Sequence, residues 1–253
     1  MCSASGIVIA TNPMTFADRS NSFLTVQIPR TSPAMTSRLL FLTLATFAAA
    51  QDAAPPAAPA PQKFDFQALM AGPVPDEYMS TDQDAKFLIV ADGENKVLEL
   101  QPQPIVDGGV LVGKSVKGPC TVSARIKATG KRRTQPRFGI GLHGISGPRL
   151  RVVPATKTIE IVKSTDKEEA VATAPYAWAS GTWTRLELTT NPAADGKGAT
   201  VEARVWEDGK PRPDAPTLTW ASPEPPAQGK ASVWGTPYSE FPIQFDDIEV
   251  KSP

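Results

Sequence analysis

The sequence has little cysteine and little histidine. Its two cysteines are Cys2 and Cys120, and His143 is its one histidine. Cys2 lies upstream of a predicted export signal, so Cys120 would stand alone in the mature chain, without a partner for an intramolecular disulfide. We interpret Cys120 as a small buried apolar residue, with a reactive thiol as the alternative. A single histidine also excludes histidine-rich metal sites.

The chain also lacks net charge and any apolar run long enough to cross a bilayer. Lysine and arginine together number 26, as do aspartate and glutamate, so the overall charge points to no particular partner. The most apolar run, residues 39–50, is shorter than the roughly 20 residues that a membrane-spanning helix needs. We therefore expect no stable membrane insertion.

Residues 35–50 contain the parts of a secretory signal peptide in the usual order. Arg38 supplies a positive charge, an apolar stretch follows, and Ala48 and Ala50 are small residues before a cleavage site at Gln51. No cysteine follows the apolar stretch, which excludes a lipid anchor. The predicted location is secreted or periplasmic, where nucleic acid is not an expected partner.

An export signal acts at the amino terminus, so we predict that translation starts at Met35 and that residues 1–34 are a disordered upstream segment. A genuine long leading region is the alternative. Residues 51–62 are almost only alanine and proline, which favours an extended linker. Residues 63–253 are enough for one well-buried domain.

From residue 63 onward, short runs alternate apolar and polar residues between turn residues, which is typical of β-strands. We predict strands at 97–100, 121–127, 137–143, 149–153, 158–163, 184–190, 200–206 and 245–250. Turn sequences at 193–196 and 207–209 separate some of them, and a short turn near 66–70 is the one helix-like candidate. This pattern predicts an all-β fold, an antiparallel β-sandwich.

Three runs resemble a known family. They are GTWTRLELTT (181–190), TVEARVWEDGKPRP (200–213) and PIQFDDIEV (242–250). Together they are similar to the concanavalin A-like lectin/glucanase jelly rolls, including the laminin-G-like and 3-keto-disaccharide-hydrolase-like domains of secreted bacterial proteins. The resemblance implies a concanavalin A-like jelly roll in which the final strand closes a sheet near the amino-terminal strand.

The resemblance leaves the activity open, because this fold hosts lectins, hydrolases and adhesion modules. The glucanases of the family carry E-x-D-x-x-E, which is absent here. The DKEE run at 166–169 has another spacing, and we interpret it as a solvated turn. The N-S-G-x-x-x-R strand of the keto-disaccharide hydrolases is also missing, and RFGIGLHG occupies the comparable place.

The strand predicted at 137–143 has one nearly bare face. Alternation puts Phe138, Ile140 and Leu142 on one side and Arg137, Gly139, Gly141 and His143 on the other. A face without side chains allows either a ligand or a neighbouring backbone to approach. We interpret His143 as a hydrogen-bonded residue at a strand end, with a catalytic or binding role as the alternative.

Basic residues cluster around this strand. Between residues 114 and 151 the chain has ten lysines or arginines and no aspartate or glutamate, among them Arg125, Arg137, Arg149 and Arg151. On one face these would bind a carboxylated or sulfated glycan or another envelope polyanion. In the alternative, cross-strand pairs with Glu160, Glu187 and Glu202 neutralise them.

The tryptophans offer a second set of candidates, because sugar rings stack on aromatic faces. We interpret Trp183, near Leu186 and Leu188, as a core residue. Trp178, Trp206 and Trp220 lie near turns and are candidates for exposed binding platforms.

Asp246 alternates with Ile248 and Val250, so it should point inward, where a carboxylate needs a partner. In related sandwiches an Asp in this strand helps to hold a structural calcium. Backbone N–H groups are the alternative partners.

The sequence favours an exported, non-catalytic carbohydrate-binding or envelope-interaction module. A glycoside-cleaving enzyme of the 3-keto-disaccharide-hydrolase type is the second interpretation, and a structural domain without a small ligand is the third. No cofactor is expected apart from the possible calcium.

Overall fold

The computed structural model describes residues 59–103, 107–164, 167–238 and 241–252. The predicted upstream segment and signal peptide, and residues 51–58 of the predicted linker, lie outside the described residues. Within the described part of the chain, no helix has the length and apolar character that a membrane crossing requires.

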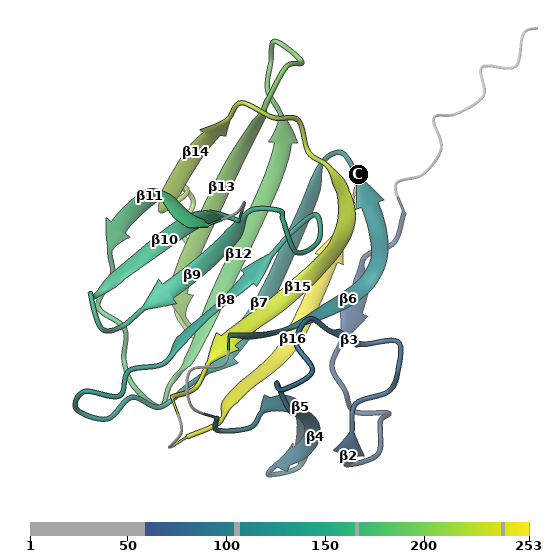
Figure 1. The fold of residues 1–253 in the computed structure, drawn as a ribbon, viewed down its shortest axis with the longest axis vertical. Coiled ribbons are helices and arrows are strands. Elements are labelled where there is room, and N and C mark those ends of the chain that lie inside the picture. The colour runs from purple at the N-terminus through teal and green to yellow at the C-terminus, as the bar shows by residue number, and fades with distance from the viewer. Residues whose placement is uncertain (1–58, 104–106, 165–166, 239–240, 253) are drawn as a thin grey trace, which may run out of the picture. The chain divides into compact units, whose positions relative to one another are not determined.

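The fold is a sandwich of two antiparallel sheets, as the alternation predicts (Figure 1). The order in sheet A is β14 (Leu218–Ser222), β13 (Ala199–Glu207), β12 (Trp183–Pro192), β7 (Cys120–Lys127), β16 (Ile243–Lys251), β5 (Asn95–Leu100), β4 (Phe87–Asp92) and β2 (Gly72–Pro73). The short strand β1 (Gln62–Phe64) also pairs with β16. The order in sheet B is β11 (Glu168–Pro175), β10 (Thr158–Ser164), β9 (Arg149–Val153), β8 (Arg137–Gly141), β15 (Gln228–Thr236), β6 (Gly108–Lys117) and β3 (Met79–Ser80).

The core fills the space between the inner faces of the two sheets. In β7 the even-numbered residues, such as Val122 and Ile126, are buried, and the odd-numbered residues, such as Arg125, face outward. Phe138 of sheet B and Phe245 of sheet A are each no more than 1% exposed. Burying one such side chain contributes about 1.5–3 kcal/mol to the stability of the fold.

All eight predicted strands are present, and β9 has the predicted bounds. The turns are also as predicted: Gly196 N donates to Ala193 O over 2.9 Å, and Lys210 N donates to Glu207 O over 3.1 Å. The 66–70 segment is a turn and not a helix. The interpretation of the DKEE run as a turn is wrong at its end, because Glu168 begins the edge strand β11.

A β-bulge interrupts β16 where it pairs with β7. The register shifts between Asp246 and Glu249, and Asp247 adopts a positive φ of 47°. One extra residue at a bulge reverses the faces of the residues beyond it. Phe245 and Ile248 therefore both point into the core, whereas Asp246 lies opposite Arg125 on the outer face of sheet A. The predicted inward direction of Asp246 is wrong for this reason.

Candidate functional site

Four of the predicted site residues meet in one pocket on the outer face of sheet B. Arg137, Gly139, Arg149 and Arg151 line this pocket together with Trp234. The pairing of β8 with its two neighbours explains the arrangement, since Gly139 lies opposite Arg151 on one side and opposite Trp234 on the other. We call this the sheet B pocket.

Trp234 covers the face of β8 that the sequence leaves bare. Its Nε1 lies close to Gly141 of β8, where a Cβ would fall 3.2 Å from it, and this Nε1 donates to Ser232 Oγ over 2.7 Å. On its other side the ring lies over Gly109 of β6, where a Cβ would fall 2.5 Å from the ring. The guanidinium carbon of Arg149 lies 3.4 Å from the ring centroid on the same indole. Trp234 is consequently only 7% exposed, with the Arg149 guanidinium covering one face of its ring.

Gly139 is needed for a different close approach. A Cβ at this position would collide with the carbonyl oxygen of Leu150 in the neighbouring strand β9. Of the two possibilities that the bare strand face leaves open, a neighbouring backbone is therefore the one found at Gly139.

Carboxylates neutralise two of the three arginines in the pocket. Arg149 Nη1 donates to Glu168 Oε1 over 3.1 Å and lies 3.5 Å from Asp107 Oδ2. Arg151 Nη2 donates to Glu160 Oε2, and its Nη1 donates to Glu168 Oε2, both over 2.8 Å. The cross-strand compensation by Glu160 is thus observed, whereas Glu187 and Glu202 pair with Arg204 on the other sheet.

Burial and pairing act in opposite directions on these two guanidinium groups. Burial lowers the pKa of Arg149, and the nearby Asp107 and Glu168 offset only part of this effect. Burial also opposes the charge of Arg151, but the hydrogen bond and charge of Glu160 raise the pKa of Arg151 above its ordinary value. Charge-assisted hydrogen bonds to carboxylates therefore hold the guanidinium groups of Arg149 and Arg151 in place.

Arg137 is the exception among the three. It contacts no carboxylate among the described residues, and its Nε, like that of Arg149, is buried without a hydrogen-bond partner there. The ring of Tyr238 lies 5.9 Å from its guanidinium carbon, a weak cation–π contact.

His143 and Trp220 line a second pocket, between the 142–148 loop and the 222–227 loop. His143 lies beyond the end of β8 with a positive φ of 62°, is 5% exposed, and its Nε2 lies 2.6 Å from Thr190 Oγ1. Burial lowers its pKa, although the carbonyls of Val116 and Ala227 raise it in part. The hydrogen-bonded strand-end interpretation fits this environment.

The remaining tryptophans do not form a common platform. Trp178 and Trp220, expected to be exposed, both pack against the core, and Trp178 lies 5.7 Å from Phe138 between ring centroids. Trp206 lies opposite Arg185 on the outer face of sheet A. The interpretation of Trp183 as a core residue is wrong, because it lies on that same outer face.

Two cations cover the Trp183 ring. Arg125 lies 4.6 Å and Lys127 lies 4.9 Å from its centroid. The outward position follows from the register of β12, in which Leu186 and Leu188 occupy the buried face.

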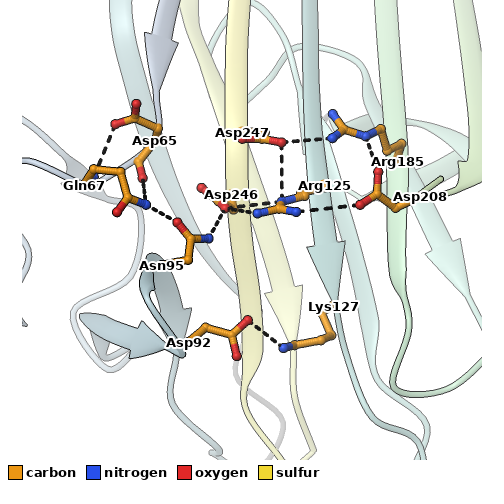
Figure 2. Close-up of polar contacts among 10 residues, drawn as sticks. All are labelled: Asp65, Gln67, Asp92, Asn95, Arg125, Lys127, Arg185, Asp208, Asp246 and Asp247. Atoms are coloured by element: carbon orange, nitrogen blue, oxygen red, sulfur yellow. Dashed lines mark hydrogen bonds and ion pairs between the residues drawn. The ribbon is translucent and has the colours of Figure 1, made fainter.

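Arg125 is also the main partner of Asp246, at the centre of the polar network in Figure 2. Asp246 Oδ2 accepts from Arg125 Nη2 over 2.5 Å and from Asn95 Nδ2 over 2.7 Å. Arg185 joins the same network, donating to Asp208 Oδ1 over 2.5 Å and to Asp247 Oδ2 over 2.9 Å.

Protein donors pair one oxygen of this carboxylate without the calcium that the family resemblance implies. Asp246 Oδ2 faces a guanidinium and an amide donor, whereas Asp246 Oδ1 is buried without a partner among the described residues. Calcium needs several oxygen ligands, and among the described residues no group of three or more histidine, cysteine, aspartate or glutamate side chains could hold a metal ion.

Sequence reasoning missed three residues of the sheet B pocket. Trp234 lies in a run with no alternation, Glu168 was assigned to a turn, and Asp107 stands alone before β6. The one available signal was the pair of small residues, Ser232 and Gly235, around Trp234, which indicates a strand packed closely on both faces.

No protein-family model matches the chain, and no curated protein matches its sequence. Solved structures do resemble it. The carbohydrate-binding module CBM66 from Bacillus subtilis is 10% identical with a TM-score of 0.49, over 70% of this chain and 96% of that one. Peanut lectin is 13% identical with a TM-score of 0.49, over 77% and 97% of the two chains.

A GH43 glycoside hydrolase is 12% identical with a TM-score of 0.53, over 76% of this chain and 40% of that one. With its two antiparallel sheets, a fold shared with this glycoside hydrolase, the chain has the jelly-roll β-sandwich that its sequence motifs predict. Identities this low establish the fold alone.

Proposed function

We propose that this domain is a non-catalytic carbohydrate-binding module and that its ligand occupies the sheet B pocket. One observation carries the proposal: the pocket places guanidinium donors beside the carboxylate acceptors of Asp107 and Glu168, next to the indole of Trp234. A sugar hydroxyl both donates and accepts hydrogen bonds, so it can pair with both kinds of group. The predicted signal peptide would deliver such a module to the envelope or the medium.

The surroundings of the two carboxylates favour binding over hydrolysis. The side chains of Glu168 and Asp107 are 36% and 45% exposed, and both contact the guanidinium of Arg149. Carboxylates held in this way suit the acceptance of hydrogen bonds from sugar hydroxyls. The alternative of a glycoside-cleaving enzyme needs two carboxyl groups that flank the scissile bond.

A glycan array probed with the full chain tests the proposal. Arg149→Lys removes the planar fork but keeps the charge, so we expect binding to fall about 10-fold or more. Arg204→Lys is the matched control, because both arginines are 8% exposed and both pair with two carboxylates. Arg204 lies on sheet A and should not affect binding.

Three results would contradict the proposal. The first is that no glycan is retained by the wild type, and the second is that Arg149→Lys binds like the wild type. The third is release of reducing sugar from a retained glycan that Glu168→Gln abolishes, which would establish the hydrolase interpretation instead.

A further inference from the structure

We infer that the ligand of the sheet B pocket is a carboxylated sugar and that Arg137 binds its carboxylate. This inference rests on the proposed function and adds the chemical class of the glycan. It assigns separate roles to three arginines that sequence reasoning treats as one basic patch.

The first step is the distribution of partners within the pocket. Arg149 and Arg151 each contact two protein carboxylates and share Glu168 between them. Their charges are therefore neutralised before a ligand arrives. Among the described pocket residues, Arg137 is the arginine without a carboxylate partner.

The second step is the state of the Arg137 donors. A guanidinium carries five N–H groups in a fixed fork, and the Nε of Arg137 is buried with no acceptor among the described residues. Arg149 Nε is buried without an acceptor as well, but the Arg149 guanidinium has two carboxylate contacts. Among the described residues of the pocket lining, Arg137 is thus the arginine whose charge no carboxylate offsets, and a bound carboxylate would offset it.

The third step is access. Gly139 follows Arg137 on the same face of β8 and has no side chain. The floor of the pocket next to Arg137 is consequently backbone, formed by Gly139 and the Leu150 carbonyl that approaches it, and no side chain stands between this floor and Arg137 on β8. The Tyr238 ring also contacts this guanidinium, with its centroid 5.9 Å from the guanidinium carbon.

One free guanidinium selects among anionic ligands. Its fork matches a single carboxylate through two parallel hydrogen bonds, so one uronic acid or similar residue satisfies it. A densely sulfated chain needs several unpaired cations in a row, which the described part of this pocket does not offer. Carboxylated glycans are therefore preferred over both neutral and highly sulfated ones.

The test uses uronic acid polysaccharides in two forms. Alginate, polygalacturonate and hyaluronan are each compared with their carboxyl-reduced derivatives, in which the carboxylate is replaced by a hydroxymethyl group. We expect the full chain to bind at least one native polymer about 10-fold or more tightly than its reduced form, as one charge-assisted pair predicts. Arg137→Gln should abolish this preference.

Arg133→Gln is the matched control, because Arg133 is exposed in the preceding turn and the substitution changes the net charge equally. It should leave the preference intact. Arg137→Lys, which keeps a charge without the fork, is measured as well and should retain part of the preference. It serves as the test variant if Arg137→Gln does not fold.

The two proposals fail in different ways. Equal binding of native and reduced polymers, or an unchanged preference in the Arg137 variants, overturns the inference while the module still binds carbohydrate. If dextran sulfate binds as tightly as the best uronate polymer, a general polyanion surface replaces it. The absence of binding to any glycan overturns the proposed function itself.

Discussion

Asp246 shows how much one buried carboxylate depends on a single cation. Its side chain is 2% exposed. Its Oδ2 accepts hydrogen bonds from Nε and Nη2 of Arg125 and from Nδ2 of Asn95, so Arg125 is the one cation bonded to it among the described residues. Removing one partner of a buried pair leaves the other charge uncompensated, which costs more than the pair itself contributes. The network in Figure 2 therefore links three strands of sheet A, through Asn95 in β5, Arg125 in β7 and Asp246 in β16.

We expect Asp246→Asn to lower the free energy of unfolding by about 3 kcal/mol, measured by urea titration. Asp247→Asn is the control, because Asp247 is 41% exposed, and it should cost less than about 1 kcal/mol. Since Arg125 is the partner, a metal chelator should leave the melting temperature unchanged. A fall in melting temperature on chelation would restore the calcium hypothesis.

His143 links stability to pH. Burial lowers its pKa in the folded state, so the unfolded chain takes up a proton at this site more readily than the folded chain. Stability from this source is complete above the unfolded pKa of about 6.5 and is lost as pH falls below it, by at most about 1.4 kcal/mol per pH unit.

Melting temperatures of the wild type should therefore fall between pH 7 and pH 5 more steeply than those of His143→Asn. Asparagine is the appropriate replacement, because it tolerates the positive φ at this position better than most residues. Parallel curves for the two proteins would show that the imidazole is protonated equally in both states.

At the scale of elements, β16 and β8 show why faces are harder to predict than strands. The alternation in FDDIEV is a local signal and locates β16 correctly. The bulge at Asp247 is not visible in it, and this one extra residue moves Asp246 to the opposite face. In β8 the bare face is visible in the sequence, but Trp234, which covers it, comes from β15.

The first strand extends the domain by one residue beyond the predicted boundary at 63. Gln62 pairs with Val250, and its Oε1 accepts a hydrogen bond from Lys114 N over 2.8 Å. A chain that starts at Gln51 should melt like the full chain. A start at Lys63 loses about 1 kcal/mol and should melt about 2–4 °C lower.

Circular dichroism melts of the three proteins measure this difference. An equal melting temperature for the Gln51 and Lys63 starts would show that Gln62 contributes nothing. A lower value for the Gln51 start than for the full chain would contradict the view that residues 1–50 are outside the domain.

At the scale of the whole molecule, the fold was the part that sequence could predict. Period-two alternation needs no knowledge of neighbours, so β7, β9 and β12 stand out. β15 did not, because residues 231–236 are all buried and show no alternation. The pocket depends on which strands pair, and of its lining only Arg137, Gly139, Arg149 and Arg151 could be proposed from the sequence.

The carboxyl-terminal strand β16 occupies the centre of sheet A, so we expect the domain to need it in order to fold. β16 lies between β7 and β5 and also pairs with β1. A chain ending at Pro242 should therefore show no cooperative thermal transition, whereas a chain ending at Lys251 should unfold like the wild type. A folded product without β16 would mean that β5 and β7 can pair directly.

This position of β16 also has a consequence for the timing of folding. Sheet A cannot close until β16 has been synthesised, because this middle strand follows all the other described strands in the chain. Contacts so distant in sequence carry a large loop-closure cost, which makes folding slow. Before β16 emerges, the facing edges of β5 and β7 lack the strand that joins them, and such unpaired edges are prone to aggregate.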